Sequence, residues 1–366
     1  MNYLKDLEEI ININSYTQNK HGVDKVNSYM TKWLEELNFE TNTYRRELIG
    51  DHTLYKSKRA DGPKILLLGH NDTVFPPNTF ENFKEDETWI YGPGVCDMKG
   101  GNIVALQSLR NIFEKNGEIH NIDFLLVSDE ETGSDDSKEL TSKLAPNYDF
   151  CFVFEAAGEK LELVTSRNGV GTFKIEIKGL AAHAGNNYSK GCDANLEASY
   201  KLQELIKLTN LELGTTVNVG KIKGGIGANT ISPNCEILLE LRYTNLNEKN
   251  RVLEAIENIV KTSYVKGSTA ILTGSIQRDV MEENNKQLKL VKLFENLTNE
   301  NIPLEKRGGV SDANIVSSFG VTTLDGFGPF GDGDHTINER ALKSSFEQRI
   351  SMVTKILDFY QNNWYI

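Results

Sequence analysis

The sequence is poor in the features that mark disulfide-stabilised and membrane-spanning proteins. It holds four cysteines, Cys96, Cys151, Cys192 and Cys235, with no close C-x-x-C pair, so we expect no disulfide framework. No apolar run approaches the roughly 18 residues that span a bilayer. Residues 1–16 are charged and lack the order of a signal peptide. We therefore expect a cytoplasmic protein with no membrane partner.

Positive charge and phosphate-binding motifs are also scarce. Lysine and arginine number 40 against 52 aspartates and glutamates, which gives a formal net charge of −12. Such a surface repels phosphate backbones, so we expect no nucleic-acid partner. The glycine-rich loop YGPGVCDMKGG at residues 91–101 matches neither the dinucleotide-binding nor the P-loop spacing. A dehydrogenase is therefore not expected.

The hydrophobic pattern of the first part indicates an α/β sheet. Continuous apolar runs, typical of buried parallel strands, alternate with helical patterns. The runs lie at residues 64–69, 122–127 and 150–154, and the helical patterns at 4–11, 23–37, 102–113 and 138–144. From about 161 to 263 the strands instead alternate apolar and polar residues, which indicates an antiparallel sheet with two helices. After about 278 the first pattern resumes, so the middle part is an insertion.

Polar residues follow several of these strands, at the sheet edge where open α/β folds bind ligands. His70 and Asp72 in GHNDTV are two residues apart at a strand end and point to the same side. An imidazole can bind a metal while a carboxylate holds its other N–H group. Glu155 follows an apolar strand, where a lone carboxylate is costly unless a positive group meets it. Alone, the His-x-Asp pair is a weak signal.

Three further motifs carry chemistry, and each has an ordinary alternative. Asp97 lies in the glycine-rich loop and could simply cap the helix that follows. Glu130 and Glu131 in SDEETG come directly after a strand, where adjacent acids repel one another unless cations compensate. An exposed acidic turn is the alternative there. His335 lies in the GDGDH loop and could be a loop histidine without a role.

In this order, the motifs resemble the M20 family of metallopeptidases, most closely its glutamate carboxypeptidase (carboxypeptidase G2) group. The resemblance covers nearly the whole chain and includes KGLAAHAG and GANTISPNCE in the middle part. It implies a zinc-exopeptidase-like catalytic domain, an α/β fold whose mixed, mostly parallel sheet has helices on both faces, at residues 1–164 and 280–366. Residues 165–279 would form an inserted α+β lid and dimerisation domain.

The resemblance also implies two divalent metal ions. His70 and Glu155 would bind one ion, Glu131 and His335 would bind the other, and Asp97 would bridge both. Nitrogen and oxygen donors without thiolate suit zinc (Zn²⁺), with cobalt (Co²⁺) or manganese (Mn²⁺) as alternatives. A hydroxide shared by the ions would attack the amide carbon.

Two more roles follow from the same resemblance. Glu130 would be the general base, and Asp72 would orient His70. Relatives have a cis peptide after the bridging acid, so we expect the Asp97–Met98 bond to be cis.

Four residues match family positions near the substrate. His183 would stabilise the oxyanion, and in relatives this histidine comes from the partner subunit. Asn229 would hold the substrate, Arg242 would grip its free carboxylate, and Ser311 would lie nearby. The alternatives are a turn histidine, a loop-shaping asparagine and an arginine that pairs with an acid on the sheet surface.

The resemblance therefore implies hydrolysis of an amide or peptide bond next to a free carboxylate. The substrate would be a small peptide or an N-acyl amino acid, and the enzyme a homodimer. A dipeptidase, a tripeptidase or a biosynthetic deacetylase of the same fold is an alternative, as is a non-catalytic small-molecule binding protein. The sequence does not reveal which side chain is accepted beside the scissile bond.

Overall fold

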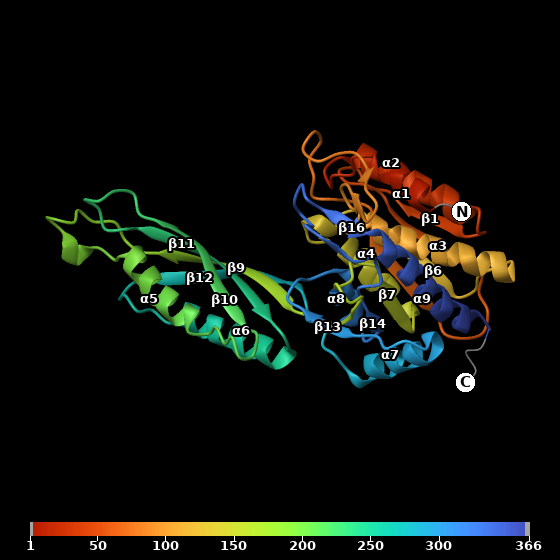
Figure 1. Cartoon of the computed structure of the whole chain (residues 1–366). Coiled ribbons are helices and arrows are strands. Elements are labelled where there is room, and N and C mark those ends of the chain that lie inside the picture. The colour runs from red at the N-terminus through yellow and green to blue at the C-terminus, as the bar shows by residue number, and fades with distance from the viewer. Residues whose placement is uncertain (1–2, 363–366) are drawn as a thin grey trace. The chain divides into compact units, whose positions relative to one another are not determined.

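The computed structural model describes residues 3–362, which form two compact units (Figure 1). The first unit comprises residues up to Thr165, Glu283–Arg307 and the residues from Ser311 onward. The second comprises Ser166–Glu282 and the short segment Gly308–Val310. The hydrophobic pattern gave no sign that Gly308–Val310 groups with the second unit. Among the helices of residues 3–362, none combines the length and hydrophobicity needed to cross a membrane.

The first unit is built on a six-stranded sheet with the order β1-β2-β6-β3-β7-β14. Its strands are β1 (Glu40–Tyr44), β2 (His52–Lys56), β3 (Ile65–His70), β6 (Ile122–Val127), β7 (Phe150–Val153) and β14 (Thr322–Leu324). β6, β3, β7 and β14 run parallel, whereas β1 and β2 extend one edge antiparallel. This mixed, mostly parallel sheet confirms the predicted fold class.

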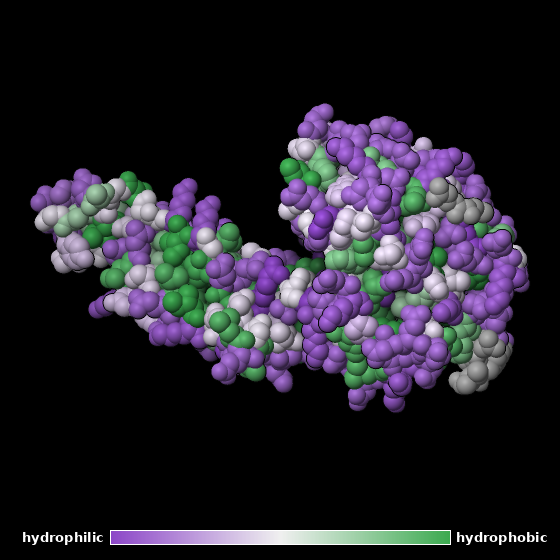
Figure 2. All heavy atoms as spheres, in the orientation of Figure 1, coloured by the Kyte–Doolittle hydropathy of each residue, from purple (hydrophilic) through white to green (hydrophobic). Residues whose placement is uncertain are grey.

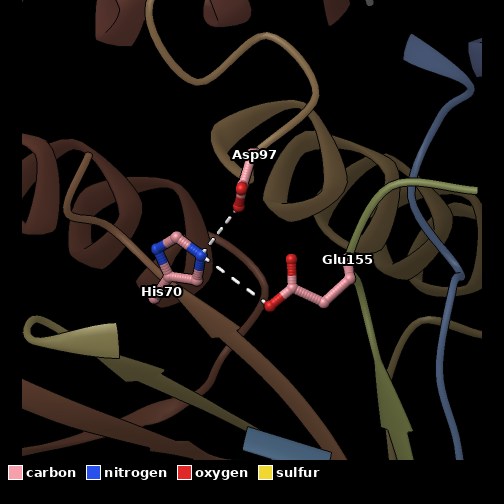
Figure 3. Close-up of side chains that lie close together, drawn as sticks. All are labelled: His70, Asp97 and Glu155. Carbon is pink, nitrogen blue, oxygen red and sulfur yellow. Dashed lines mark hydrogen bonds and ion pairs between the residues drawn. The ribbon is translucent and has the colours of Figure 1, made fainter. Parts of the chain in front are cut away.

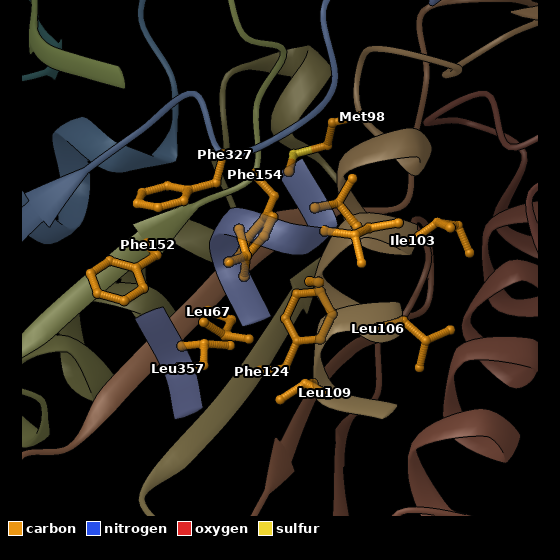
Figure 4. Close-up of a cluster of buried hydrophobic side chains, with 14 of the residues drawn as sticks. Leu67, Met98, Ile103, Leu106, Leu109, Phe124, Phe152, Phe154, Phe327 and Leu357 are labelled. Carbon is orange, nitrogen blue, oxygen red and sulfur yellow. The ribbon is translucent and has the colours of Figure 1, made fainter. Parts of the chain in front are cut away.

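Helices cover this sheet because its central strands are apolar on both faces. Every residue of β3 and β6 is buried, which requires cover on each side. The helices are α1 (Tyr3–Ile11), α2 (Lys20–Glu35), α3 (Lys99–Asn116), α4 (Ser137–Leu144), α7 (Asn285–Thr298), α8 (Asp312–Ser317) and α9 (Lys343–Asn362). In the core, Leu67 and Phe124 from the strands meet Leu106 of α3 and Leu357 of α9 (Figure 4). All four side chains are fully buried.

Shorter strands complete the first unit. A four-stranded sheet with the order β15-β16-β5-β4 places the late chain beside the early chain. Its strands are β4 (Lys84–Glu85), β5 (Trp89–Tyr91), β15 (Gly331–Asp332) and β16 (Arg340–Leu342), and β8 (Leu163–Arg167) pairs separately with β13 (Leu304–Arg307). Arg340 pairs with Asp332 and lies 4.1 Å from the ring centre of Trp89. The pair of Asp332 and Arg340 therefore fixes both ends of the loop between β15 and β16.

The second unit is an antiparallel sheet covered on one face by two helices (Figure 1). The strand order is β10-β11-β9-β12. The elements are β9 (Gly169–Lys178), η3 (Tyr188–Lys190), α5 (Ala194–Ile206), β10 (Thr216–Gly224), β11 (Asn234–Tyr243), α6 (Leu246–Lys261) and β12 (Thr269–Arg278). From Phe173 along β9, buried and half-exposed residues alternate, so one face joins the core with α5 and α6. β12 lies beyond residue 263, where the alternating pattern predicted from the sequence ends.

Candidate metal centre

Parallel strands of the first unit deliver polar residues to one edge of the sheet. His70 is the last residue of β3, and Glu155 comes two residues after the end of β7. Glu130 and Glu131 open the 3-10 helix η1 (Glu130–Thr132), which follows β6. Because β3 lies between β6 and β7, these residues are neighbours in space. Ligands bind at this edge in open parallel sheets.

The first group of donor atoms is formed by His70, Asp97 and Glu155 (Figure 3). Nε2 of His70 lies 3.2 Å from Oδ1 of Asp97 and 3.8 Å from Oε1 of Glu155. The imidazole edge and the two carboxylates point toward one another. One donor atom from each residue lies within 4.8 Å of the others, a spacing at which a single cation could contact all three.

The second group contains Asp97 again, with Glu131 and His335. Nε2 of His335 lies 3.3 Å from Oδ2 of Asp97 and 3.2 Å from Oε2 of Glu131. The two oxygens of Asp97 therefore face different histidines, as a carboxylate shared by two cations would. His335 has a φ of 60°, a left-handed conformation that is uncommon outside glycine. The GDGDH loop holds this conformation while it carries the imidazole to the cluster.

The cluster of three carboxylates and two imidazoles is short of positive charge. Burial, and next the charge of Asp97, raises the pKa of Glu131 to about 8 and that of Glu155 well above its ordinary value. Burial opposes ionisation of Asp97 as well, yet its hydrogen bonds with His335 and His70 hold its pKa below the usual range. Hydrogen bonds with Asp97 and Glu131 raise the pKa of His335 to about 11.

These shifts mean that the cluster retains protons when no cation compensates its charge. A divalent cation in each group would replace those protons, and imidazole with carboxylate is a donor set that zinc accepts. The residues present therefore fit a pair of divalent ions. Cys96, which precedes Asp97, belongs to neither donor group.

Asp72 holds both the first histidine and the acidic turn. Nδ1 of His70 lies 3.0 Å from the backbone oxygen of Asp72 and 3.4 Å from its Oδ1. The carboxylate also accepts bonds from the backbone N–H groups of Glu130 and Glu131, at 3.3 Å each. A third donor, Oγ1 of Thr17, lies 2.7 Å from Oδ2. One buried carboxylate thus positions residues from both donor groups.

Several residues that support this site were not predicted from the sequence. Thr17 carries no motif, and only its contact with Asp72 reveals it. Asn102 of α3 donates to the backbone oxygen of His70 at 2.7 Å. A Cβ on Gly69 would lie 2.1 Å from Oδ1 of Asn102, which explains the glycine before His70. Glu339, four residues after His335, hydrogen-bonds to the backbone of Asp97.

The peptide bond between Asp97 and Met98 is cis, as expected. Met98, and not Asp97, is the N-cap of α3, and its side chain makes no cap hydrogen bond. All four cysteines are buried free thiols, in line with the expected absence of disulfides.

Within the second unit, His183 and Asn229 lie on facing segments. The backbone of Ala184 donates to the backbone oxygen of Asn229, and His183 faces Thr230 in an antiparallel bridge. Nδ1 of His183 accepts from the backbone N–H groups of Gly185 and Asn186, at 3.2 Å each. Its proton therefore resides on Nε2. His183 and Asn229 are both exposed.

Arg242 lies at the end of β11 and is engaged within the second unit. Its Nε donates to Glu240 at 2.8 Å, and its guanidinium also donates to the backbone oxygen of Gly308 at 3.1 Å. The pairing with an acid on the sheet is one of the two readings that the sequence left open. The side chain is 37% exposed, so this pairing does not remove it from solvent.

Ser311 has a structural role in the first unit. It is the N-cap of α8, where its hydroxyl accepts from the backbone of Ala313 and forms a capping box with Asn314. The same hydroxyl donates to Asp325 at 2.7 Å, and the residue is 1% exposed. These contacts account for Ser311 without a substrate, and we leave it out of the proposed substrate site.

Comparison with known proteins places the chain in a family. A model of the peptidase family M20/M25/M40 matches residues 66–358. Carboxypeptidase G2 from Pseudomonas sp. (strain RS-16) is 26% identical to this chain, over 97% of the chain and 88% of that protein. Succinyl-diaminopimelate desuccinylase from Rickettsia bellii is 27% identical, over 98% and 94% respectively.

Solved structures share the fold over the same extent. Aminopeptidase PepT from Bacillus cereus has a TM-score of 0.82 at 20% identity and covers 98% of both chains. A tripeptidase from Staphylococcus aureus has a TM-score of 0.81 at 23% identity, over 98% of this chain and 97% of its own. With a family model that spans most of its length, the protein is a metal-dependent peptidase or amidohydrolase, and the chain belongs to the peptidase family M20/M25/M40.

Proposed function

We propose that the protein hydrolyses an amide or peptide bond next to a free carboxylate, as a carboxypeptidase or N-acyl-amino-acid hydrolase. The observation that carries this proposal is the pair of donor groups that share Asp97. His70 and Glu155 would hold one divalent ion, Glu131 and His335 the other, and Asp97 both. Zinc suits these donors, and cobalt or manganese could replace it.

Glu130 would move the protons in this reaction. The two ions, when bound, would polarise the scissile carbonyl and the attacking water. The carboxylate of Glu130 would take a proton from that water and deliver it to the leaving nitrogen. Its neighbour Glu131 cannot do this, because its carboxylate belongs to the second donor group. The bond from the backbone of Glu130 to Asp72 fixes the base relative to that group.

Residues of the second unit would bind the substrate. His183, with its proton on Nε2, can donate a hydrogen bond to the oxyanion that forms on the carbonyl. Asn229 would add a polar contact. The planar guanidinium of Arg242 suits bidentate binding of a carboxylate. A substrate carboxylate would compete there with Glu240, whose pairing with Arg242 is exposed and therefore weak.

A homodimer formed through the second unit is part of the proposal. The resemblance to the M20 family implies that the partner subunit would supply the histidine at the position of His183. The second unit carries most of the exposed large hydrophobic side chains, and apolar residues gather on it in the face drawn in Figure 2. The exposed hydrophobic residues of the second unit include Leu180, Tyr188, Ile206, Leu211, Ile222, Ile226 and Ile271. Exposed apolar surface can mark a protein interface. The four buried thiols suit a reducing compartment, which supports a cytoplasmic location.

The choice of substrate separates this proposal from its alternatives. The relatives include a carboxypeptidase, a desuccinylase and a tripeptidase, so a tripeptidase or a biosynthetic deacetylase is the second candidate. A panel of N-acyl amino acids, dipeptides, tripeptides and the corresponding C-terminal amides distinguishes them. Activity on acyl amino acids and loss of activity on the amides would support our proposal. Activity confined to tripeptides would support the alternative.

A pair of glutamate variants tests the chemistry. With zinc or cobalt present, Glu130→Ala should lower kcat by about 10²–10⁴-fold, the usual contribution of general acid–base catalysis. Glu139→Ala is the matched control, because the side chain of Glu139 on α4 is 78% exposed and pairs with Lys143. Equal activity of the wild type and Glu130→Ala would refute the proposed base. A wild type that binds these compounds without cleaving any of them would support a non-catalytic binding protein.

A further inference from the structure

Glu339 is a buried acid that the proposed reaction does not use. It is 1% exposed and lies just before β16, at the end of the loop that carries His335. Its own backbone is fixed at both ends, since its N–H donates to Thr336 at 3.2 Å and its oxygen accepts from Gly92 at 3.5 Å. A carboxylate buried this completely needs hydrogen-bond donors around it.

The donors come from the loop that leads to Asp97. Oε2 of Glu339 accepts from the backbone of Gly94 at 2.9 Å. Oε1 accepts from the backbones of Cys96 and Asp97, at 3.1 Å each, and from the thiol of Cys96 at 3.4 Å. A single side chain therefore binds three peptide N–H groups within four residues, and the last belongs to the shared ligand itself.

The two loops also pack directly against each other. A Cβ added to Gly331 would lie 2.4 Å from Cβ of Cys96, so only glycine allows the approach. β16 pairs with β5, which places residues 340–342 against residues 89–91. Glu339 is thus the polar connection inside an interface that joins the Asp97 loop to the His335 loop.

From this geometry we propose that Glu339 is a positioning residue, which fixes Asp97 relative to His335 and so sets the second of the two ion sites. The inference rests on the proposed two-ion function. His70 is the last residue of β3 and Glu155 comes two residues after the end of β7, so strands of the main sheet support the first site. Asp97 and His335 both stand on loops, and Glu339 is the side chain that bonds one loop to the other. Hydrogen-bond partners of metal ligands commonly contribute 10- to 100-fold to metal affinity.

The test measures zinc binding by competition with a chromogenic chelator, for the wild type, Glu339→Gln and Glu339→Asp. Glutamine keeps one acceptor but turns an N–H₂ group toward a donor, and aspartate withdraws the carboxylate by one methylene. Both variants should bind the second ion 10–100 times more weakly than the wild type, and the first ion only slightly more weakly, because Asp97 belongs to both donor groups. His335→Ala removes a ligand of the second site alone, so the zinc-binding step that this variant loses belongs to the second ion. The electronic spectrum of the cobalt-loaded protein should lose the same component in all three variants.

Asp123→Asn is the control for a merely structural effect. Asp123 is also fully buried, and its carboxylate accepts a hydrogen bond from the backbone N–H of Ser57. It lies near the start of β6, at the opposite end of that strand from Glu130 and the metal centre. This variant should lose stability and keep both zinc affinities. Equal loss of zinc in Asp123→Asn and Glu339→Gln would overturn the proposal, as would unchanged affinities in Glu339→Gln and Glu339→Asp.

Hydrogen exchange of the metal-free protein separates this inference from the proposed function. The amides of residues 94–97 should exchange faster in Glu339→Gln than in the wild type, whatever the protein binds. Unchanged exchange would show that Glu339 does not hold the loop. If the wild type bound fewer than two ions, the two-ion function would fail, while the exchange result would still decide the role of Glu339.

Discussion

Replacing Asp72 by asparagine should impair the metal centre without changing the volume of the side chain. The carboxylate is fully buried, and its partners are donors: Thr17 at 2.7 Å and the backbones of Glu130 and Glu131 at 3.3 Å each. Asparagine replaces one oxygen with an N–H₂ group, so at least one of these donors then faces another donor. A hydrogen bond to a charged group contributes about 1.5–3 kcal/mol. If that loss is expressed at the site, kcat/KM falls by roughly 10- to 150-fold.

The assay compares kcat/KM and zinc affinity for the wild type, Asp72→Asn and Thr17→Val. Thr17→Val removes one neutral donor and leaves the carboxylate in place, so its effect should be several-fold smaller. Zinc affinity of Asp72→Asn should fall in parallel with activity, because the same carboxylate holds His70 and Glu131. A variant that melts earlier than the wild type but keeps its activity and its zinc affinity would refute this reasoning.

Three further outcomes are expected. Arg242→Ala should raise KM at least tenfold for substrates with a free carboxylate and much less for their amides. Its Tm should change little, because the pair that Arg242 forms with Glu240 is exposed. Similar losses on both kinds of substrate would indicate a structural arginine. Removing the ions with a chelator should lower Tm, and zinc should restore it, because a ligand that binds only the folded state stabilises that state; an unchanged Tm would count against bound ions. Hydrogen bonds, first from Arg251 and then from Thr215, hold the pKa of Glu248 at about 2 instead of 4.5. The ionised carboxylate of Glu248 therefore contributes fully to the free energy of unfolding above pH 4.5, and this contribution is lost as the pH falls toward 2. Calorimetry should show Glu248→Gln less stable at pH 7, with a flatter dependence of Tm on pH between 4.5 and 2; identical slopes for both proteins would contradict this.

The main sheet could be predicted because its strands are long, continuous apolar runs. The run at residues 64–69 became β3, one residue further along, and 122–127 became β6 without change. Strand ends then located His70 and the acids that follow β6, since parallel strands present their carboxyl ends at one edge. Asp97 and His335 do not stand on strands. They were assigned to the same site because the order of the motifs along the chain resembles that of the M20 family.

The small sheet escaped prediction for the opposite reason. β4, β5, β15 and β16 are two or three residues long, too short for any alternation to be visible. Their pairing is determined by tertiary contacts such as the packing of Arg340 on Trp89. Glu339 was missed with them, because an acid in a loop looks solvated until its neighbours are known.

Two local contacts could also have been predicted from the sequence. Ser311 precedes Asp312 and has Asn314 three residues later, a spacing typical of a helix N-terminus. Glu240 and Arg242 are two residues apart on a strand, so they share a face and can pair. In both places a local rule predicts a contact that the structure shows, whether or not the residue also binds a substrate.

The most direct test of the account is a zinc-soaked crystal examined by anomalous scattering at the zinc edge. We expect two peaks in the first unit. One should be bound by His70 and Glu155, the other by Glu131 and His335, and Asp97 should contact both. A single peak, or peaks that leave His70 and His335 without zinc, would contradict the two-ion site on which the proposed hydrolysis depends.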